Sequence, residues 1–283
     1  MCGPLVIDNM NKLIFSMALL FFGSILNSCA AQVHLNTSIR TAKKSFVKVE
    51  TYIAECDEER GACMFPRLFA SGSGSVVRYR NGKAILTAAH VCYLGEIEKE
   101  LNKTGGGVLL KIQDRIGRKS TVHVIKYNIH HDVCLLGMDD LDLPALRLSV
   151  KEPVYAERMY NISAPMGISN LEMVPVFEGL YMGIDRNRAH YGLPTIGGAS
   201  GSPILNSRGE LVGMIHSVHF RFHHLTLSVT YKNLWNFLKD NQDDIDTYVQ
   251  QSASNAIDWS TPDVEPLPLE MYFLKYLEDF EKE

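Results

Sequence analysis

The sequence predicts an all-β protein that ends in one helix. Short apolar segments recur through residues 45–230, and Gly, Asn, Asp or Pro separates most of them from the next. Several alternate apolar with polar residues, which is the period of a half-buried strand. Strands at such regular intervals are typical of a β-sandwich or a β-barrel.

The strands are expected in order along the chain. In residues 73–90, Asn81-Gly82 joins two apolar runs and predicts a tight hairpin. Residues 106–128 repeat the pattern with Gly117 in the turn. Further strand-like segments occupy residues 45–53, 154–167, 173–185, 202–220 and 224–231. The one convincing helix covers residues 231–239, where Leu234, Phe237 and Leu238 follow the spacing i, i+3, i+4.

The N-terminal segment, residues 1–31, is predicted to direct export. Its apolar run of 14 residues, 13–26, is short for a membrane span and suits the central region of a signal peptide. A buried core helix is the alternative, and Met10 is an alternative start. The run ends in LNSC, which resembles a lipoprotein signal with Cys29 as the lipidated residue, although Asn27 is unusual there. We therefore expect a periplasmic or secreted protein, released or attached to the membrane through this segment or Cys29.

Export makes disulfides the expected state of the remaining cysteines. Cys56, Cys63, Cys92 and Cys134 are even in number, and an oxidising compartment favours bridges. Cys56 and Cys63 flank a segment short enough for a loop or hairpin and are the favoured pair. The sequence leaves the pairing of the other two open. A zinc site is the rival hypothesis, but no CxxC pair supports it, and no metal or cofactor is predicted.

Three short segments carry residues suited to nucleophilic catalysis. They are LTAAHVC around His90, HDVCLL around Asp132, and GGASGSP around Ser200. Each residue alone is more often structural: a histidine after a strand, an aspartate before one, or a serine in a glycine-rich turn. Together they supply a base, an acid that orients it, and a nucleophile.

These segments resemble the signatures of the chymotrypsin-like serine proteases, in the family's order His, Asp, Ser. The stretch that precedes His90 is most similar to the bacterial HtrA branch. The resemblance covers residues 44–241 and implies two six-stranded antiparallel β-barrels with the site between them. His90 and Asp132 would come from the first barrel and Ser200 from the second. An α/β-hydrolase is excluded because Ser202 replaces the second glycine of G-x-S-x-G and βα units are missing.

The resemblance also implies roles for neighbouring residues. The backbone N–H groups of Gly198 and Ser200 would form the oxyanion hole. Pro194 would lie at the base of the pocket for the residue before the cleaved bond. The substrate backbone would pair near His216, Ser217 and Val218. Because no carboxylate stands at Pro194, we expect cleavage after small or medium apolar residues, or after acidic residues if His216 or His219 reaches the pocket.

The expected domains are a targeting segment (1–31), a first barrel (32–145), a second barrel with the helix (146–245) and an acidic tail (246–283). The tail is too short for the PDZ domain of HtrA proteases, and it is expected either to dock on the barrels as a helix or to bind a partner. The net charge of −4 and the lack of a basic run argue against nucleic acid as a partner. Protein or peptide substrates are expected, and the oligomeric state stays open. The alternative function is an inactive, protease-like binding module.

Overall fold

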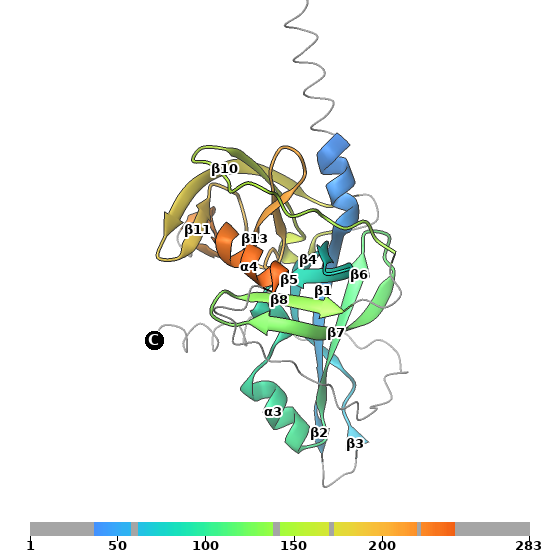
Figure 1. Cartoon of the computed structure of the whole chain (residues 1–283). Coiled ribbons are helices and arrows are strands. Elements are labelled where there is room, and N and C mark those ends of the chain that lie inside the picture. Colours follow the sequence, from blue (N-terminus) through green and yellow to red (C-terminus); the bar gives the residue numbers. More distant parts are fainter. Residues whose placement is uncertain (1–36, 58–61, 138–141, 170–172, 220–221, 241–283) are drawn as a thin grey trace, which may run out of the picture.

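The computed structural model describes residues 37–57, 62–137, 142–169, 173–219 and 222–240. Twelve of the strands within these residues close into two antiparallel barrels of six strands each (Figure 1). The predicted fold class is therefore confirmed. The predictions for residues 1–31, Cys29 and the tail 246–283 fall outside the described residues.

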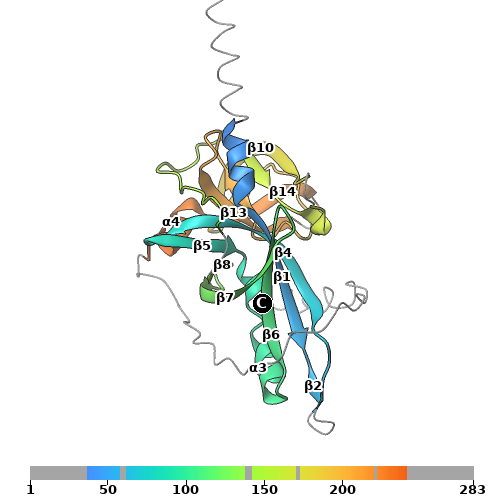
Figure 2. The same cartoon turned by 90° about the vertical axis from the view of Figure 1, so that its right-hand side faces the viewer.

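The first barrel has the strand order β1-β4-β5-β8-β7-β6. Its strands are β1 (Phe46–Ala54), β4 (Arg67–Tyr79), β5 (Gly82–Thr87), β6 (Gly107–Asp114), β7 (Lys119–Asn128) and β8 (Val133–Gly137). Strands β1, β4 and β6 run on past the barrel, where the ribbon of β2 (Cys56–Asp57) and β3 (Ala62–Cys63) and the helix α3 (Glu96–Lys103) lie (Figure 2).

The second barrel has the order β10-β11-β14-β13-β12-β9. Its strands are β9 (Arg158–Ile162), β10 (Val176–Asp185), β11 (Arg188–Tyr191), β12 (Pro203–Leu205), β13 (Leu211–His219) and β14 (Phe222–Val229). Outside the barrels, residues 37–42 are helical and lead into the 3-10 turn η1 (Lys43–Ser45). A second 3-10 turn, η2 (Pro165–Gly167), and a helical turn, α2 (Ala89–Cys92), lie in loops.

The two barrels share part of their apolar core. One buried cluster joins the first barrel to residues of the second, including Leu205 and Met214, and to Leu234, Phe237 and Leu238 of α4 (Tyr231–Lys239). The predicted helix is thus confirmed at its predicted bounds. Thr230 caps it by accepting a hydrogen bond from the Asn233 N–H. Because this cluster crosses between the barrels, it holds the surfaces that flank the site in one arrangement.

Three elements differ from the sequence-based expectation. The β4–β5 turn is centred on Arg80 and Asn81 rather than Asn81-Gly82, because Tyr79 pairs with Gly82. Arg80 takes the positive φ of 49°, and ion pairing to Asp240 holds its side chain there. Strand β11 was not anticipated as a separate strand. Helix α3 was missed because it is mostly charged and buries only Leu101.

Every helix among the described residues is too short or too polar to cross a membrane.

Candidate active site

His90 and Asp132 form a two-point contact. The chain leaves β5 at Thr87 and turns into α2, which places His90 one residue after the buried Ala89. The backbone N–H of His90 donates to Asp132 Oδ1 at 2.9 Å, and His90 Nδ1 lies 2.7 Å from Asp132 Oδ2. Both carboxylate oxygens are therefore used to orient one residue. The ring's other nitrogen, Nε2, remains available for a reacting group.

Asp132 occupies the turn between β7 and β8. Its φ of +51° lies in the left-handed region, which aspartate tolerates better than most side chains. Its own N–H donates to the carbonyl of Ile129 at 3.1 Å. This turn directs the carboxylate away from the strand ladder and toward His90.

A disulfide joins the two segments that carry this pair. Cys92 follows His90 by two residues, Cys134 follows Asp132 by two, and the two sulfurs are bonded. Both cysteines are buried. The bridge thus fixes the α2 turn against the start of β8, beside the His90–Asp132 contact. It also supplies the pairing that the sequence left open.

For the predicted Cys56–Cys63 disulfide, the structure describes one of the two side chains. Cys56 is disulfide-bonded, and Cys63 is its register partner across the β2–β3 ribbon. Both facts agree with the expected pair, although the Cys63 side chain lies outside the described residues.

Ser200 lies in a turn that is fastened to the first barrel through Ser73 of β4. The N–H of Ser73 donates to the Ser200 carbonyl at 2.7 Å, and its hydroxyl donates to the Gly198 carbonyl at 2.8 Å. The same hydroxyl accepts from the Ala164 N–H at 3.0 Å. Ser73 was not among the residues that the sequence marked as candidates. Its signal was weak, because serine in SGSGS looks like a turn, whereas it is a fully buried strand residue.

Close packing makes glycine necessary on both sides of Ser200. Gly201 has φ +87°, and a Cβ there would lie 2.1 Å from the Ser73 carbonyl oxygen. Gly198 has φ +90°, and a Cβ there would lie 2.8 Å from the Ala164 carbonyl oxygen. Gly197, by contrast, has open space around it and no positive φ. The expected need for glycine thus applies to Gly198 and not, on these grounds, to Gly197.

The Gly198–Ser200 turn presents two unused backbone donors. Within the described part of the chain, neither the Gly198 N–H nor the Ser200 N–H donates to a carbonyl. The neighbouring groups are occupied: the Gly197 carbonyl accepts from the Met166 N–H at 2.6 Å, and the Ala199 N–H donates to Ile196 at 3.1 Å. An oxyanion hole requires free N–H groups of this kind, held in place before charge develops.

The Ser200 hydroxyl has one long contact. Its Oγ lies 3.5 Å from the His216 carbonyl oxygen, and among the described residues it is not hydrogen-bonded to His90. In enzymes without substrate, hydrogen bonds between catalytic groups are often long or poorly aligned and tighten when the substrate binds.

A model of the trypsin-like peptidase domain matches residues 72–214, a span that contains His90, Asp132 and Ser200. The chain belongs to the trypsin-like peptidase family.

A solved structure of the serine endoprotease from Yersinia pestis is similar to this trypsin-like peptidase, with a TM-score of 0.53 and 18% sequence identity. The similar region covers 71% of this chain and 64% of the Yersinia pestis chain. At this identity the similarity supports the fold alone. A search of curated proteins found no match.

The residues expected to bind substrate in this trypsin-like peptidase lie on two segments beside Ser200. Pro194 is half-buried in the loop between β11 and β12. His216, Ser217 and Val218 belong to β13, which pairs with β12 only as far as Met214. Beyond that point β13 pairs with β14 on one side, and no described strand covers the other.

His216 interrupts the β13–β14 register. Ile215 pairs with Ser228 and Ser217 with Leu227, so His216 is the extra residue of a bulge. Its carbonyl thereby points to Ser200, and its Nδ1 lies 2.9 Å from the Ser217 hydroxyl. Burial lowers the pKa of the His216 imidazole to about 4, against a smaller opposing effect of Asp132. The ring is therefore neutral near pH 7.

The described residues contain no group of three or more His, Cys, Asp or Glu side chains arranged to hold a metal ion.

Proposed function

We propose that this trypsin-like peptidase is a serine endopeptidase that works through an acyl-enzyme. The observation that carries the proposal is the combination of the His90–Asp132 contact with a serine turn whose two N–H groups have no protein acceptor among the described residues. In this proposal His90 is the base, Asp132 is the carboxylate that orients it, Ser200 is the nucleophile, and the two N–H groups are the anion site.

The reaction begins when His90 Nε2 takes the proton of Ser200 Oγ. The oxygen bonds to the carbonyl carbon of the scissile peptide, and the charge on the carbonyl oxygen is held by the N–H groups of Gly198 and Ser200. His90 then gives the proton to the leaving amine as the C–N bond breaks. Water, deprotonated by His90, attacks the resulting ester and releases the acid, which restores Ser200.

The open side of β13 supports a place for the substrate backbone. A peptide in extended form would pair with residues 216–218, as peptides do when they add to an exposed sheet edge. We propose that the residue before the cleaved bond is small or medium and apolar, in a pocket near Pro194. Preference for an acidic residue through His216 is less well supported, because burial keeps the imidazole neutral.

The two cysteine observations support export as the location. Cys92 and Cys134 are bridged and Cys56 is also oxidised, and such bonds persist in oxidising compartments. We propose a periplasmic or secreted peptidase. Lipid labelling tests whether the N-terminal segment or Cys29 attaches it to the membrane.

Labelling with a fluorophosphonate probe tests the assignment of the nucleophile. Ser200→Ala and His90→Ala should abolish labelling and lower kcat/KM on unfolded casein by roughly 10³-fold or more, as lesions in such triads do. The control is Ser207→Ala, which removes an exposed serine in the β12–β13 turn. This variant should be labelled as strongly as the unmodified protein. Labelling that persists in Ser200→Ala would show that another residue is the nucleophile.

The alternative is a binding module without catalysis, which the missing Ser200–His90 hydrogen bond favours. In that case the unmodified protein would bind unfolded casein but would neither cleave it nor react with the probe. Unchanged thermal unfolding of the variants would show that lost labelling reflects chemistry rather than misfolding.

A further inference from the structure

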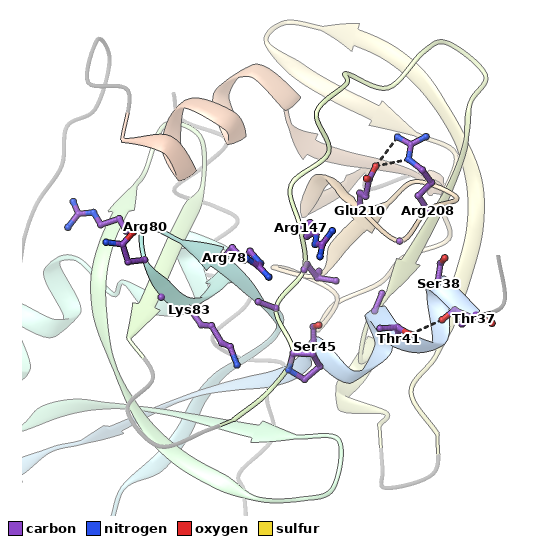
Figure 3. A pocket seen from close by; sticks show the side chains of 17 residues that line it. Thr37, Ser38, Thr41, Ser45, Arg78, Arg80, Lys83, Arg147, Arg208 and Glu210 are labelled. Carbon is purple, nitrogen blue, oxygen red and sulfur yellow. Dashed lines mark hydrogen bonds and ion pairs between the residues drawn. The ribbon is translucent and has the colours of Figure 1, made fainter. Parts of the chain in front are cut away.

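A groove lies away from Ser200, along the linker that joins the two barrels. Its volume is about 1440 Å³, and residues 144–147 of the linker line it together with the end of β4. Figure 3 shows this groove. The helical residues 37–42 and the β12–β13 turn form its other walls. Its charged lining residues are Arg78, Arg80, Lys83, Arg147, Arg208 and Glu210.

Backbone hydrogen bonds place two of these arginines next to each other. The Leu146 N–H donates to the Val76 carbonyl at 2.8 Å, and the Arg78 N–H donates to the Leu146 carbonyl at 3.3 Å. On the other side, the Leu211 N–H donates to the Arg147 carbonyl at 2.8 Å. The linker therefore lies between β4 and β13, and Arg78 and Arg147 come together in the middle of the groove (Figure 3).

The other cations that line the groove each have a carboxylate partner, unlike these two arginines. Arg80 pairs with Asp240 at 2.8 Å, Lys83 with Asp142 at 3.0 Å, and Arg208 with Glu210 at 2.8 Å.

Arg78 and Arg147 are both exposed, and no carboxylate of the described residues pairs with either. Neighbouring like charges repel each other. A bound carboxylate would relieve this repulsion, since guanidinium groups match it in charge and in hydrogen-bond geometry.

The chain itself holds a strongly acidic segment that begins beside the groove. The 43 residues after Asp240 contain eleven acidic residues and two lysines. Asp240 forms its ion pair with Arg80, which lines the groove. The first acidic residues of the segment are Asp243, Asp244 and Asp246. At roughly 3.3 Å per extended residue, they lie within about 10 to 20 Å of chain from Asp240.

We propose that the groove is the docking site of this acidic segment, and that Asp243, Asp244 and Asp246 pair with Arg78 and Arg147. Attachment at Asp240 favours this occupant over a separate anion, because a short connection gives a high effective concentration and a small entropy cost of closure. The proposal is independent of catalysis at Ser200.

Zero-length crosslinking tests the contact in the full chain. The protein carries Ser200→Ala to prevent self-cleavage, together with Arg78→Lys and Arg147→Lys, which keep the charge and supply amines. A carbodiimide should join positions 78 and 147 to peptides containing residues 243–246, and the yield should fall severalfold at ~0.5 M salt because exposed ion pairs are screened. In the control, Arg115→Lys and Arg186→Lys, both outside the groove lining, should give no such product.

Crosslinking a mixture of unlabelled and isotope-labelled protein shows whether the bound segment belongs to the same molecule or to another copy. Crosslinked peptide pairs that carry the same isotope support the proposal. Pairs in which one peptide is labelled and the other is not would mean that the groove takes the segment of another copy. Either that result or the absence of crosslinks from positions 78 and 147 would overturn the proposal.

Charge reversal gives a second measurement, the rate at which chymotrypsin cleaves after Tyr248. Arg78→Glu with Arg147→Glu should raise this rate about fivefold, the effect expected from losing exposed ion pairs. Adding Asp243→Lys and Asp244→Lys should return it to within about twofold of the starting protein, since opposite charges are restored. An unchanged rate after reversal, or no recovery on the second reversal, would contradict docking.

Discussion

His216 shows how a backbone irregularity and burial act on one residue beside Ser200. The bulge in β13 turns its carbonyl to Ser200 Oγ, 3.5 Å away, while its half-buried ring interacts with the charges of Asp132 and His90. Desolvation disfavours the charged imidazole, so the pKa falls to about 4. Because the unfolded chain binds this proton near pH 6.5, the buried ring costs no stability above that pH and destabilises the fold progressively as the pH falls from 6.5 toward 4.

The first residue-scale prediction is that His216 does not titrate between pH 5.5 and 8. Its imidazole NMR resonances should stay constant over this range in Ser200→Ala protein labelled at histidine. The spectrum of His216→Asn identifies the resonances, since asparagine can still accept from the Ser217 hydroxyl. Titration with a midpoint near 6.5 would show that burial is weaker than the structure indicates, and would revive the hypothesis of an acidic cleavage preference.

At the scale of elements, Asp240 joins the end of α4 to the first barrel. Its carboxylate accepts from the Tyr79 hydroxyl at 2.9 Å, Arg80 Nε at 2.8 Å and Lys126 Nζ at 2.5 Å. Lys126 is buried, and its amine also donates to the Phe237 carbonyl of α4. The carboxylate thus neutralises a buried cation at the point where helix and barrel meet.

These contacts decide the pKa of Asp240. Burial alone would raise it, but the hydrogen bonds from Lys126, Arg80 and Tyr79 outweigh burial and lower it to about 2. A carboxyl whose pKa is lower in the folded protein stabilises the fold above its unfolded value, near 3.9. The contribution is lost as the pH falls from about 4 to about 2.

Asp240→Asn is therefore expected to lower the free energy of unfolding at pH 7 by roughly 1 to 3 kcal/mol. This is below the ~3 to 5 kcal/mol of a fully buried pair, because 31% of the Asp240 side chain is exposed. Urea denaturation measures the difference, which should shrink between pH 4 and pH 2. Adding Lys126→Met should recover part of the loss. Asp142→Asn, which removes the exposed partner of Lys83, should have no measurable effect.

At the scale of the whole molecule, the sequence predicted what depends on pattern and missed what depends on contacts between distant segments. Alternating segments predicted an all-β protein, and the three signature segments, through their resemblance to a known family, predicted the two barrels. The same segments named His90 and Asp132, which lie in contact, and Ser200, whose role as nucleophile stays a prediction. The role of Ser73 follows from hydrogen bonds to residues more than ninety positions away, which no local pattern encodes. The Cys92–Cys134 bridge depends likewise on how β5 and β8 pair.

The same long-range contacts determine whether the site needs activation by proteolysis. By resemblance to the digestive branch of the family, an aspartate at Ala199 would bind a newly formed N-terminal ammonium and shape the oxyanion hole. Ala199 is buried and has no charge. An ammonium placed against it would lose its hydration without gaining a partner, at a cost of several kcal/mol. The turn is held instead by Ser73, through the Gly198 carbonyl, and by Met166, through the Gly197 carbonyl.

We therefore predict that blocking the N-terminus leaves activity unchanged. One protein begins at Gln32 with a free amine, and the other carries an uncleaved tag before Gln32. Their kcat/KM values should agree within about threefold, which corresponds to a difference of ~0.6 kcal/mol in activation free energy. Ser73→Ala should lower kcat/KM in both forms, since the Gly198 carbonyl and the Ala164 N–H lose their shared partner. If the tagged protein were inert until a cut exposed a new N-terminus, an ammonium would be supplying the order that we assign to Ser73 and Met166.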